Sequence, residues 1–583
     1  MRVIRDVFTQ ARPIDRRIEK VIDYAATDEA RLEQEISEYE VTASVERGLR
    51  RFIEAFDDGA RLGTVTEIGV WVSGFYGSGK SSLTKYLGLA LDSRRKIKGV
   101  PFVDRLADRI ADRALGLHLK KVAKQHKAAI FMLDLGTDQL AESASDSVAN
   151  VLYWNVLKEL GFSKEKKVAD LEIRLEQDQK LAAFEAAYEA HYPGREPWRV
   201  IHDDPMLAVT RASALVPAFY PDDFKTPADF RQLRYQPTED VKELARRTIA
   251  LVRRRTGCEA IVFFVDEVGQ YVAPRRELIL NLDGLVRAFK EAGQGKVWFV
   301  ATAQQTLTEI SERASLNSAE LFKLKDRFPI SLELLATDIR EITAQRLLKK
   351  NADGEAELKR RYQASAELLE LHTHLTDWQG GKGTLDADTF ASLYPFLPSR
   401  LDLVLDLIRA LARRTGGTGL RSAIRLVQDL LVDASRALPK GVEPLAERPL
   451  GRLATVEDVY DTLRQDIHKE HPQAVEGVDR IARHAGFKGD ALALRVAKAV
   501  AALQPLENRP RTAENIAALL YADLGASGHT EAVRQALHRL VDAQEFGLVE
   551  LRADGGAGGI GVNRLIVVGL CSLSPDFVPP KFG

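Results

Sequence analysis

The sequence predicts an α/β core with a parallel sheet, followed by a region made mainly of helices. Short apolar runs rich in β-branched and aromatic residues recur as far as Leu334, and helical patterns separate them. Beyond Asp338 such runs cease, and helical spacing continues until two glycine-separated strands near the end of the sequence. With 583 residues, the chain has room for three or four domains.

Five runs are typical of strands that are buried on both faces of a parallel sheet, because they are short and mostly apolar. The helical segments between them supply the right-handed crossovers that parallel strands require. The first core helix is expected to stop at Asp58-Gly59. The expected strands are 68–73, 129–135, 261–265, 297–301 and 330–334, and the expected core helices are 45–56, 81–91, 147–160, 239–255 and 278–291.

Changes in composition divide the chain into four parts and mark two insertions in the core. A stretch containing proline and glycine between the last two parts is typical of a linker. The expected parts are an N-terminal helical segment (1–44), the α/β core (45–336) with insertions at about 101–127 and 163–237, a helical region (337–440) and a C-terminal domain (450–583).

Charge and cysteine content limit the classes of function. The 83 Lys and Arg residues balance 84 Asp and Glu residues, which argues against a uniformly basic nucleic-acid-binding surface but allows a local patch. Two cysteines cannot build a disulfide framework, and they fit a reducing compartment. No apolar run is long enough to span a membrane, and the first residues lack the apolar stretch of a secretory signal. We therefore expect a cytoplasmic protein with no membrane attachment.

The segment Gly74–Ser81 carries the clearest chemical motif. Its sequence GFYGSGKS matches G-x-x-x-x-G-K-[ST] and lies between an expected strand and an expected helix, as a phosphate-binding loop requires. Glycines let consecutive backbone N–H groups face one anion, and the helix that begins near Lys80 adds its positive dipole end. We expect ATP as the ligand, with Lys80 at the β- and γ-phosphates and Ser81 as a Mg²⁺ ligand. The expected nucleotide-binding residues here are Gly74, Gly77, Ser78, Gly79, Lys80, Ser81 and Ser82.

An acidic pair at the end of the most apolar strand supplies the second half of the expected site. Strand 261–265 leads directly into Asp266 and Glu267, at the carboxyl edge where ligands bind in open α/β sheets. Asp266 is expected to hold Mg²⁺, directly or through water, and also to contact the nucleotide. Glu267 is expected to polarise the attacking water, which favours hydrolysis over transfer to another acceptor.

Further residues after the acidic pair are candidates for the same site. After strand 297–301, a polar side chain of Thr302, Gln304 or Gln305 can orient the attacking water or sense the γ-phosphate, or it can simply cap the strand. Arg327 precedes the last core strand; it can reach toward a neighbouring subunit and stabilise transition-state charge, or form a surface salt bridge. Arg421 opens a helix and can fold back onto the nucleotide.

The order of these motifs is similar to that of AAA+ ATPases, within the branch that includes the origin-recognition and Cdc6-like initiators. The resemblance implies a P-loop α/β core, an all-helical lid over 337–440 and a winged-helix-like domain over 450–583, with nucleotide between core and lid. Thr512–Leu524, Thr530–Val541 and the two final strands suit a helix, helix and two-stranded wing. Lys80 and Asp266 lie farther apart than a minimal core requires, which is why insertions are expected.

The N-terminal sequence also resembles the P-loop ATPase of BREX anti-phage systems, the BrxC or PglY family. That resemblance implies an ATPase of bacteriophage defence that acts with a methyltransferase, a phosphatase-like protein and smaller partners on or near DNA. Members are usually longer, so a truncated or short form is expected. The likeness rests on Asp6-Val7-Phe8, Pro13-Ile14-Asp15-Arg16, Glu38-Tyr39-Glu40-Val41-Thr42 and 68–80, and continues at Asp266-Glu267 and Asp326-Arg327-Phe328.

Two functions remain open on the sequence. The first is ATP hydrolysis coupled to assembly of a homo-oligomer and to binding of DNA or a partner. The alternative is a nucleotide-gated DNA-binding scaffold or signalling switch with little turnover. In a winged-helix domain, Thr530–Val541 would be the recognition helix, and its Arg534, His538 and Arg539 share a face that can serve DNA or protein contacts.

Overall fold

The computed structural model divides into two compact units, an α/β unit whose described residues lie within 28–334 and a helical unit that combines 2–16 with residues from 335 onward. Each unit is considered by itself. The structure describes residues 2–16, 28–63, 68–74, 79–135, 147–204, 206–235, 238, 240–304, 306–307, 322–378, 385–415, 423–435, 438–439, 441–506, 509–543, 548–552 and 565–570.

The α/β unit is built on a five-stranded parallel sheet with the strand order β4-β5-β6-β1-β7. All five expected strands are confirmed, and the sheet is fully buried along β1, β5 and β6. Ser73 pairs with Ala303 and Asp134 pairs with Asp266, so these strands end at a common carboxyl edge. The strands are β1 (Gly69–Ser73), β4 (Ala128–Asp134), β5 (Ala260–Asp266), β6 (Val297–Ala303) and β7 (Ile330–Glu333).

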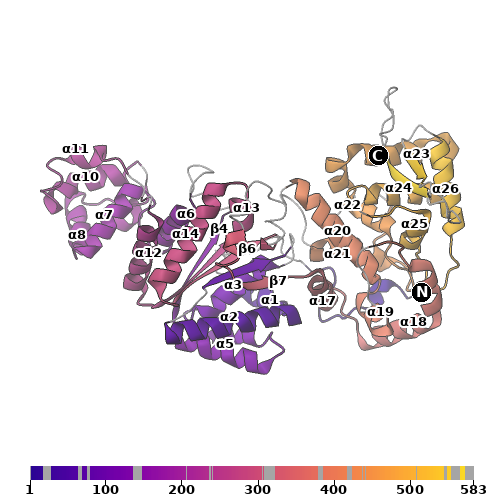
Figure 1. Cartoon of the computed structure of the whole chain (residues 1–583), viewed down its shortest axis with the longest axis horizontal. Coiled ribbons are helices and arrows are strands. Elements are labelled where there is room, and N and C mark those ends of the chain that lie inside the picture. The colour runs from indigo at the N-terminus through magenta and orange to yellow at the C-terminus, as the bar shows by residue number, and fades with distance from the viewer. Residues whose placement is uncertain are drawn as a thin grey trace. The chain divides into compact units, whose positions relative to one another are not determined.

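Helices cover both faces of this sheet, with α2, α3 and α5 on one side and α6, α12 and α14 on the other (Figure 1). Close packing of α3 depends on Gly88, where an added Cβ would lie 2.3 Å from Cε of Met132. The helices are α1 (Glu29–Ser37), α2 (Ala43–Leu62), α3 (Lys80–Leu91), α4 (Phe102–Ala107), α5 (Arg113–Gln125), α6 (Val148–Glu159), α12 (Val241–Thr256), α13 (Val268–Val272) and α14 (Arg276–Gly293), and β2 (Lys96–Ile97) pairs with β3 (Val100–Pro101).

Helix α2 is longer than its sequence pattern predicts. The expected stop at Asp58-Gly59 is wrong, because Gly59 is buried inside the helix and the helix continues to Leu62. Gly63 ends it with φ of 66°, a left-handed conformation that glycine adopts without the steric cost of a Cβ.

The two segments expected to be insertions pack differently. Helices α4 and α5 bury Leu106, Leu115 and Leu119 in the main core of the α/β unit. The second segment has a small core of its own, in which the fully buried Glu172 accepts a hydrogen bond from Nε1 of Trp198 at 2.8 Å. Its helices are α7 (Lys166–Gln177), α8 (Leu181–His191), α9 (Trp198–Ile201), α10 (Ala208–Phe219) and α11 (Pro227–Gln232).

The helical unit has one continuous hydrophobic core, to which residues 2–16 contribute Ile4, Val7 and Ile14. The stretch expected to be a linker is partly built into this core, because Leu445 and Ala446 are buried. The elements are η1 (Ile4–Val7), α17 (Ala336–Arg346), α18 (Ala352–Thr373), α19 (Ala387–Leu393), α20 (Pro398–Thr415), α21 (Ala423–Val432), η2 (Leu445–Glu447), α22 (Val456–Glu470), α23 (Pro472–Arg483), η3 (Ala485–Phe487), α24 (Ala491–Leu503), α25 (Ala513–Leu520), α26 (Thr530–Asp542), β8 (Leu548–Arg552) and β9 (Leu565–Leu570).

The α/β core and the helical region that follows it are confirmed. Strands β8 and β9 pair in antiparallel fashion near the end of the described chain, although the winged-helix arrangement and the division into lid and C-terminal domain stay predictions. Within the residues that the structure describes, no helix has the length and apolar character needed to cross a membrane.

Candidate functional site

Helix α3 begins directly at the motif that the sequence singled out. Gly79 precedes Lys80 with φ of 98°, a conformation that side chains disfavour and glycine permits. The first-turn N–H groups of a helix lack partners within the helix, so they are available to an anion. Gly74 follows the last residue of β1, whereas the predicted ligands Gly77 and Ser78 lie outside the described residues.

The side chain of Lys80 is buried, with only 8% of the residue exposed, and it turns back toward the loop. Its Nζ donates a hydrogen bond to the carbonyl oxygen of Gly74 at 2.7 Å. Burial lowers the pKa of Lys80 to about 8, and the negative charges of Asp266 and Glu267 partly oppose this shift. A cation is therefore held beside Gly74, within the electrostatic influence of two carboxylates.

Ser81 and Asp266 are brought together at the carboxyl edge of the sheet. Oγ of Ser81 donates to Oδ2 of Asp266 at 2.5 Å, and Asp266 is buried at the end of β5. Hydroxyl and carboxylate oxygens are the hard ligands that Mg²⁺ prefers, so this pair fits the metal expected from the sequence. Ser82 is the next residue of α3 and is half-buried.

Thr302 orients the acidic pair from the neighbouring strand. Its Oγ1 donates to Oδ1 of Asp266 and accepts a hydrogen bond from the backbone N–H of Glu267 at 3.0 Å. The residue is completely buried, and it lies inside β6, because that strand runs two residues beyond the predicted end at Ala301. Thr302 therefore holds the Asp266 carboxylate in place.

Glu267 has a strained backbone at the point where β5 passes into α13. Its φ of 58° lies in the left-handed region, which typically costs a non-glycine residue about 1 kcal/mol or more. Burial raises the pKa of Glu267, and the charges of Asp266 and Asp134 raise it further, while Lys80 lowers it. Such strain and such a raised pKa are common at functional sites.

Asp134 is a site residue that the sequence pattern did not single out. It ends β4 and pairs in register with Asp266, which places it at the same sheet edge. The available signal was that an apolar strand ends in an acidic residue there, as β5 does.

Gln304 lies at the carboxyl ends of the parallel strands, and Arg327 lies at their amino ends. Gln304 directly follows β6, beside the carboxyl ends of β5 and β1. The backbone of Arg327 packs against Gly69 at the amino end of β1, where an added Cβ would lie 1.8 Å from the carbonyl oxygen of Arg327. Nε of Arg327 donates to Oδ1 of Asp283 at 2.9 Å. The structure thus gathers Lys80, Ser81, Asp266, Glu267 and Gln304 at one edge and separates Arg327 from them, while Arg421 lies outside the described residues.

Within the described residues, no group of three or more His, Cys, Asp and Glu side chains is arranged to hold a metal ion. A Mg²⁺ ion at Ser81 and Asp266 would therefore need oxygen ligands from phosphates and water, as is usual for Mg²⁺ in nucleotide sites.

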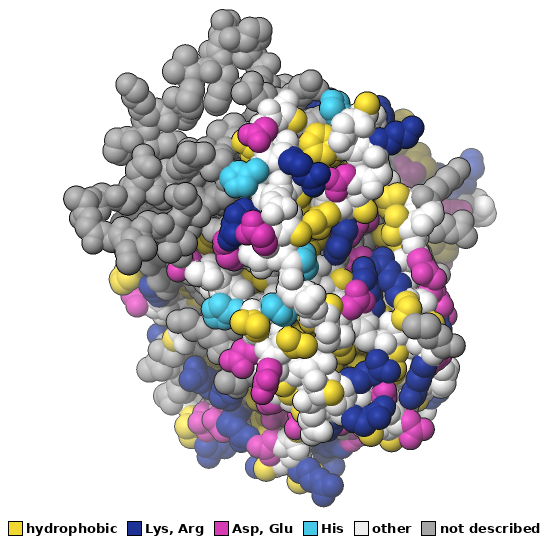
Figure 2. All heavy atoms as spheres, turned by 90° about the vertical axis from the view of Figure 1, so that its right-hand side faces the viewer, with side chains coloured by type: hydrophobic (Ala, Val, Ile, Leu, Met, Phe, Trp, Pro, Cys, Tyr) yellow, Lys and Arg dark blue, Asp and Glu magenta, His cyan; other side chains and the backbone are white. Residues whose placement is uncertain are grey.

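The helical unit carries charges of both signs around α26, the candidate recognition helix. Arg534 pairs with Glu514 at 2.6 Å, and Arg539 pairs with Asp490 at 2.8 Å, so both guanidinium groups of the candidate recognition helix α26 are engaged. Figure 2 shows Lys and Arg side chains interspersed with Asp and Glu on the face of the molecule that it presents. Such a surface lacks the one-signed field that concentrates phosphates.

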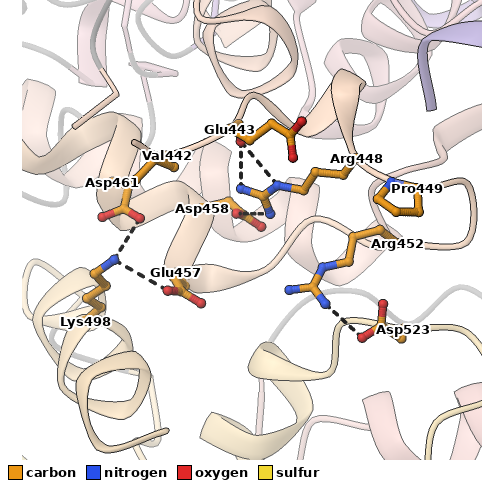
Figure 3. Close-up of a pocket in the computed structure, with 10 residues that line it drawn as sticks. All are labelled: Val442, Glu443, Arg448, Pro449, Arg452, Glu457, Asp458, Asp461, Lys498 and Asp523. Atoms are coloured by element: carbon orange, nitrogen blue, oxygen red, sulfur yellow. Dashed lines mark hydrogen bonds and ion pairs between the residues drawn. The ribbon is translucent and has the colours of Figure 1, made fainter. Parts of the chain in front are cut away.

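A pocket of about 420 Å³ in the helical unit is also lined by charged residues (Figure 3). Its three basic side chains are all ion-paired with carboxylates of the same pocket. The pairs are Arg448 with Asp458 (2.6 Å), Arg452 with Asp523 (2.8 Å) and Lys498 with Asp461 (2.8 Å). These pairs engage all three basic groups of the pocket, and its lining assigns it no ligand.

One family model matches the chain, and its description is BREX System ATPase PglY protein 2nd domain, over residues 340–484. This match supports a protein of the BREX PglY/BrxC family. The match lies in the helical unit, from within α17 to the residue that follows α23. It confirms, through a different part of the sequence, the family suggested by the N-terminal motifs. The matched domain indicates a component of a BREX defence system.

Proposed function

We propose that this PglY-family chain binds and hydrolyses ATP with Mg²⁺ and couples its nucleotide state to assembly and to DNA or partner binding in BREX defence. One observation carries the proposal. Lys80, Ser81 and Asp266, which are distant in the sequence, meet at a single sheet edge, and Ser81 contacts Asp266 directly. The description of the matching family as an ATPase supports the same activity.

Each residue at the edge has a role that its position supports. The N–H groups around Gly79 and the ammonium group of Lys80 hold the phosphates, and Lys80 exchanges its hydrogen bond to Gly74 for one to a phosphate oxygen. Ser81 and Asp266 hold Mg²⁺, which neutralises phosphate charge when bound. Ser82 and Arg421 remain proposed nucleotide contacts.

Glu267 is the proposed general base. A carboxylate with a raised pKa accepts a proton from water more readily than an ordinary one, and the left-handed backbone fixes its direction. Gln304, at the end of the adjacent strand, orients the water. This assignment favours hydrolysis over a scaffold that only holds nucleotide, which is the alternative function.

Arg327 is proposed to act on the site of a neighbouring subunit. Its position at the amino edge of the sheet keeps it away from the site of its own chain, so any contact with a nucleotide would be in the site of a neighbouring subunit; the ion pair with Asp283 is the structural alternative. This role requires a homo-oligomer and release from Asp283. The methyltransferase, the phosphatase-like protein and smaller BREX components remain proposed partners, and DNA contact through the C-terminal part stays a prediction.

The proposal is tested by phosphate release from ATP, with Mg²⁺ or EDTA and with or without DNA, beside mass photometry in ATP and ADP. We expect Mg²⁺-dependent turnover and a nucleotide-dependent change of assembly state. Tight ATP binding with no turnover under all conditions would favour the scaffold, and absence of ATP binding would contradict both functions.

The depressed pKa of Lys80 predicts that nucleotide affinity depends on pH. With a pKa of about 8, free Lys80 is charged at pH 7 and mostly neutral at pH 9, while bound phosphate favours the charged form. We expect ATP affinity to fall about tenfold between pH 7 and pH 9, with proton uptake on binding measured by calorimetry. In the nucleotide-free protein, burial of the charged Lys80 lowers the free energy of unfolding below about pH 8. This destabilisation decreases as the pH rises above 8, because Lys80 loses its proton in the folded state.

Lys80→Arg is the control for this pH dependence, because guanidinium stays charged across the range. An equal fall in affinity for Lys80→Arg and the wild type would show that another group titrates.

Thr302→Val is expected to weaken Mg²⁺-ATP binding by about tenfold, as the loss of a hydrogen bond that orients a metal ligand typically does. The substitution keeps the shape of the side chain but leaves Oδ1 of Asp266 and the N–H of Glu267 without the hydroxyl. Titration of ATP at several Mg²⁺ concentrations measures the effect, and Thr302→Ser, which keeps the hydroxyl, should bind like the wild type. Unchanged affinity in Thr302→Val would remove Thr302 from the site.

A further inference from the structure

Lys85 is a buried lysine of α3 that the proposed chemistry does not use. Its side chain is fully buried, and its Nζ lies 3.0 Å from Oε2 of Glu35 on α1. The same carboxylate accepts hydrogen bonds from the hydroxyl of Tyr86 at 3.4 Å and from Nε of Arg31 at 3.0 Å. Glu35 therefore ties α1 to the helix whose first residue is Lys80.

A second contact joins the same two parts of the chain. The ring of Tyr39, just after α1, meets the ring of Tyr86 edge-on with centroids 4.8 Å apart. The carbonyl oxygen of Tyr39 accepts a hydrogen bond from Nε of Arg109 at 2.9 Å, which fixes this turn. Tyr39 belongs to the motif 38–42, for which the proposed chemistry has no role. We call residues 29–42 the N-terminal clamp.

Helix α3 also fits closely against the sheet. At Gly88, an added Cβ would lie 2.3 Å from Cε of Met132 and 3.2 Å from the ring of Phe264, so the backbone of the helix packs closely against β4 and β5. The clamp contacts at Lys85 and Tyr86 lie one to two turns beyond Lys80. The start of α3 is therefore set by the sheet and by the clamp together.

Burying Glu35 and Lys85 costs desolvation free energy, so a gain in stability alone does not explain why an ion pair occupies these positions. Removing two charges from water costs free energy, and an apolar pair of similar volume is often as stable or more stable. In some proteins a buried ion pair selects a single arrangement, because any other position leaves a buried charge without its partner. In sequence, the clamp follows residues 2–16, which belong to the helical unit.

We propose that the Glu35–Lys85 ion pair positions α3, and with it Lys80 and Ser81, so that nucleotide binding and the seating of the N-terminal clamp are coupled. The proposal rests on the proposed function, because it assigns a means of regulation to the same site. Coupling is reciprocal: ATP that favours one position of α3 strengthens the clamp contact, and a seated clamp strengthens ATP binding.

The test is the double variant Glu35→Leu/Lys85→Met, which replaces the ion pair by apolar side chains. Each single substitution leaves a buried charge unpaired and is expected to lower the melting temperature, whereas the double variant is expected to recover it. We expect the double variant still to bind ATP about fivefold or more weakly than the wild type. Wild-type affinity in a stable double variant would overturn the proposal and leave the proposed function intact.

Glu172→Gln is the matched control, because Glu172 is a fully buried carboxylate in the separate core of α7–α11. We expect it to lower the melting temperature without changing ATP affinity. A wild-type protein that does not bind ATP at all would instead contradict the proposed function, so the two failures are distinguishable.

Hydrogen exchange on the unmodified protein gives a second measurement if the double variant does not fold. Mg²⁺-ATP is expected to slow exchange in α1 as well as in α3, and to leave α8 unchanged. Slower exchange in α3 with no change in α1 would overturn the coupling.

Discussion

Lys80→Ala is expected to weaken ATP binding by about a hundredfold and to abolish measurable turnover. The ammonium group makes charge-assisted hydrogen bonds to phosphate, and losing bonds of this kind costs about 3 kcal/mol. The melting temperature of the nucleotide-free protein should not fall, because the depressed pKa of Lys80 shows that burying its charge disfavours the folded state. Binding of a fluorescent ATP analogue and thermal melting measure the two effects.

Lys96→Ala is the control for Lys80→Ala, because Lys96 is an exposed lysine of the same unit, on β2. It is expected to bind and hydrolyse ATP like the wild type. If Lys80→Ala retained wild-type affinity, the phosphates would have to lie elsewhere, and the assignment of the loop would be wrong.

Glu267→Gln is expected to bind ATP at least as tightly as the wild type and to hydrolyse it at least a hundredfold more slowly. The amide cannot accept a proton from water, which removes a contribution of about 10²–10⁴ in rate. It also removes a negative charge that Asp266 and Asp134 already disfavour, and that would repel phosphates. Single-turnover phosphate release and equilibrium binding separate the two effects.

Glu277→Gln removes an exposed carboxylate from α14 and serves as the control for Glu267→Gln. It should leave turnover unchanged. Wild-type turnover in Glu267→Gln would assign the base to another group, of which Asp134 is the nearest candidate by strand register.

Much of the sheet could be predicted because its strands are buried on both faces. Strand β5 is a continuous apolar run as far as Asp266, and the glycine-rich sequence after β1 has a spacing that few other local structures require. Both halves of the site therefore stand out in the amino-acid sequence by itself. The end of α2 was harder to predict, since Gly59 disfavours a helix but is tolerated inside a packed one.

Thr302 and Asp134 could not be assigned from spacing alone. Thr302 is polar, so the apolar run in the sequence stops before it. Threonine nevertheless favours strands, and its hydroxyl donates a hydrogen bond to Asp266 on the neighbouring strand. Asp134 becomes significant only through the register that sets it beside Asp266. Strand register depends on which strands are neighbours, and a single sequence does not give that order.

The Glu35–Lys85 ion pair could not be predicted from the sequence either. On a helix, a lysine usually faces water, and nothing in the sequence marks Lys85 as fully buried. Its partner lies on α1, which packs against α3 only after the chain has passed through α2 and β1. Long-range ion pairs of this kind depend on tertiary packing, and no local pattern in the sequence predicts them.

The most direct test is an experimental structure of the Glu267→Gln protein with Mg²⁺-ATP. We expect the β- and γ-phosphates at the start of α3 within hydrogen-bonding distance of Nζ of Lys80. We also expect Mg²⁺ bound by Oγ of Ser81 and held by the Asp266 carboxylate, directly or through one water. Nucleotide bound elsewhere, or Mg²⁺ with no link to Asp266, would contradict the account.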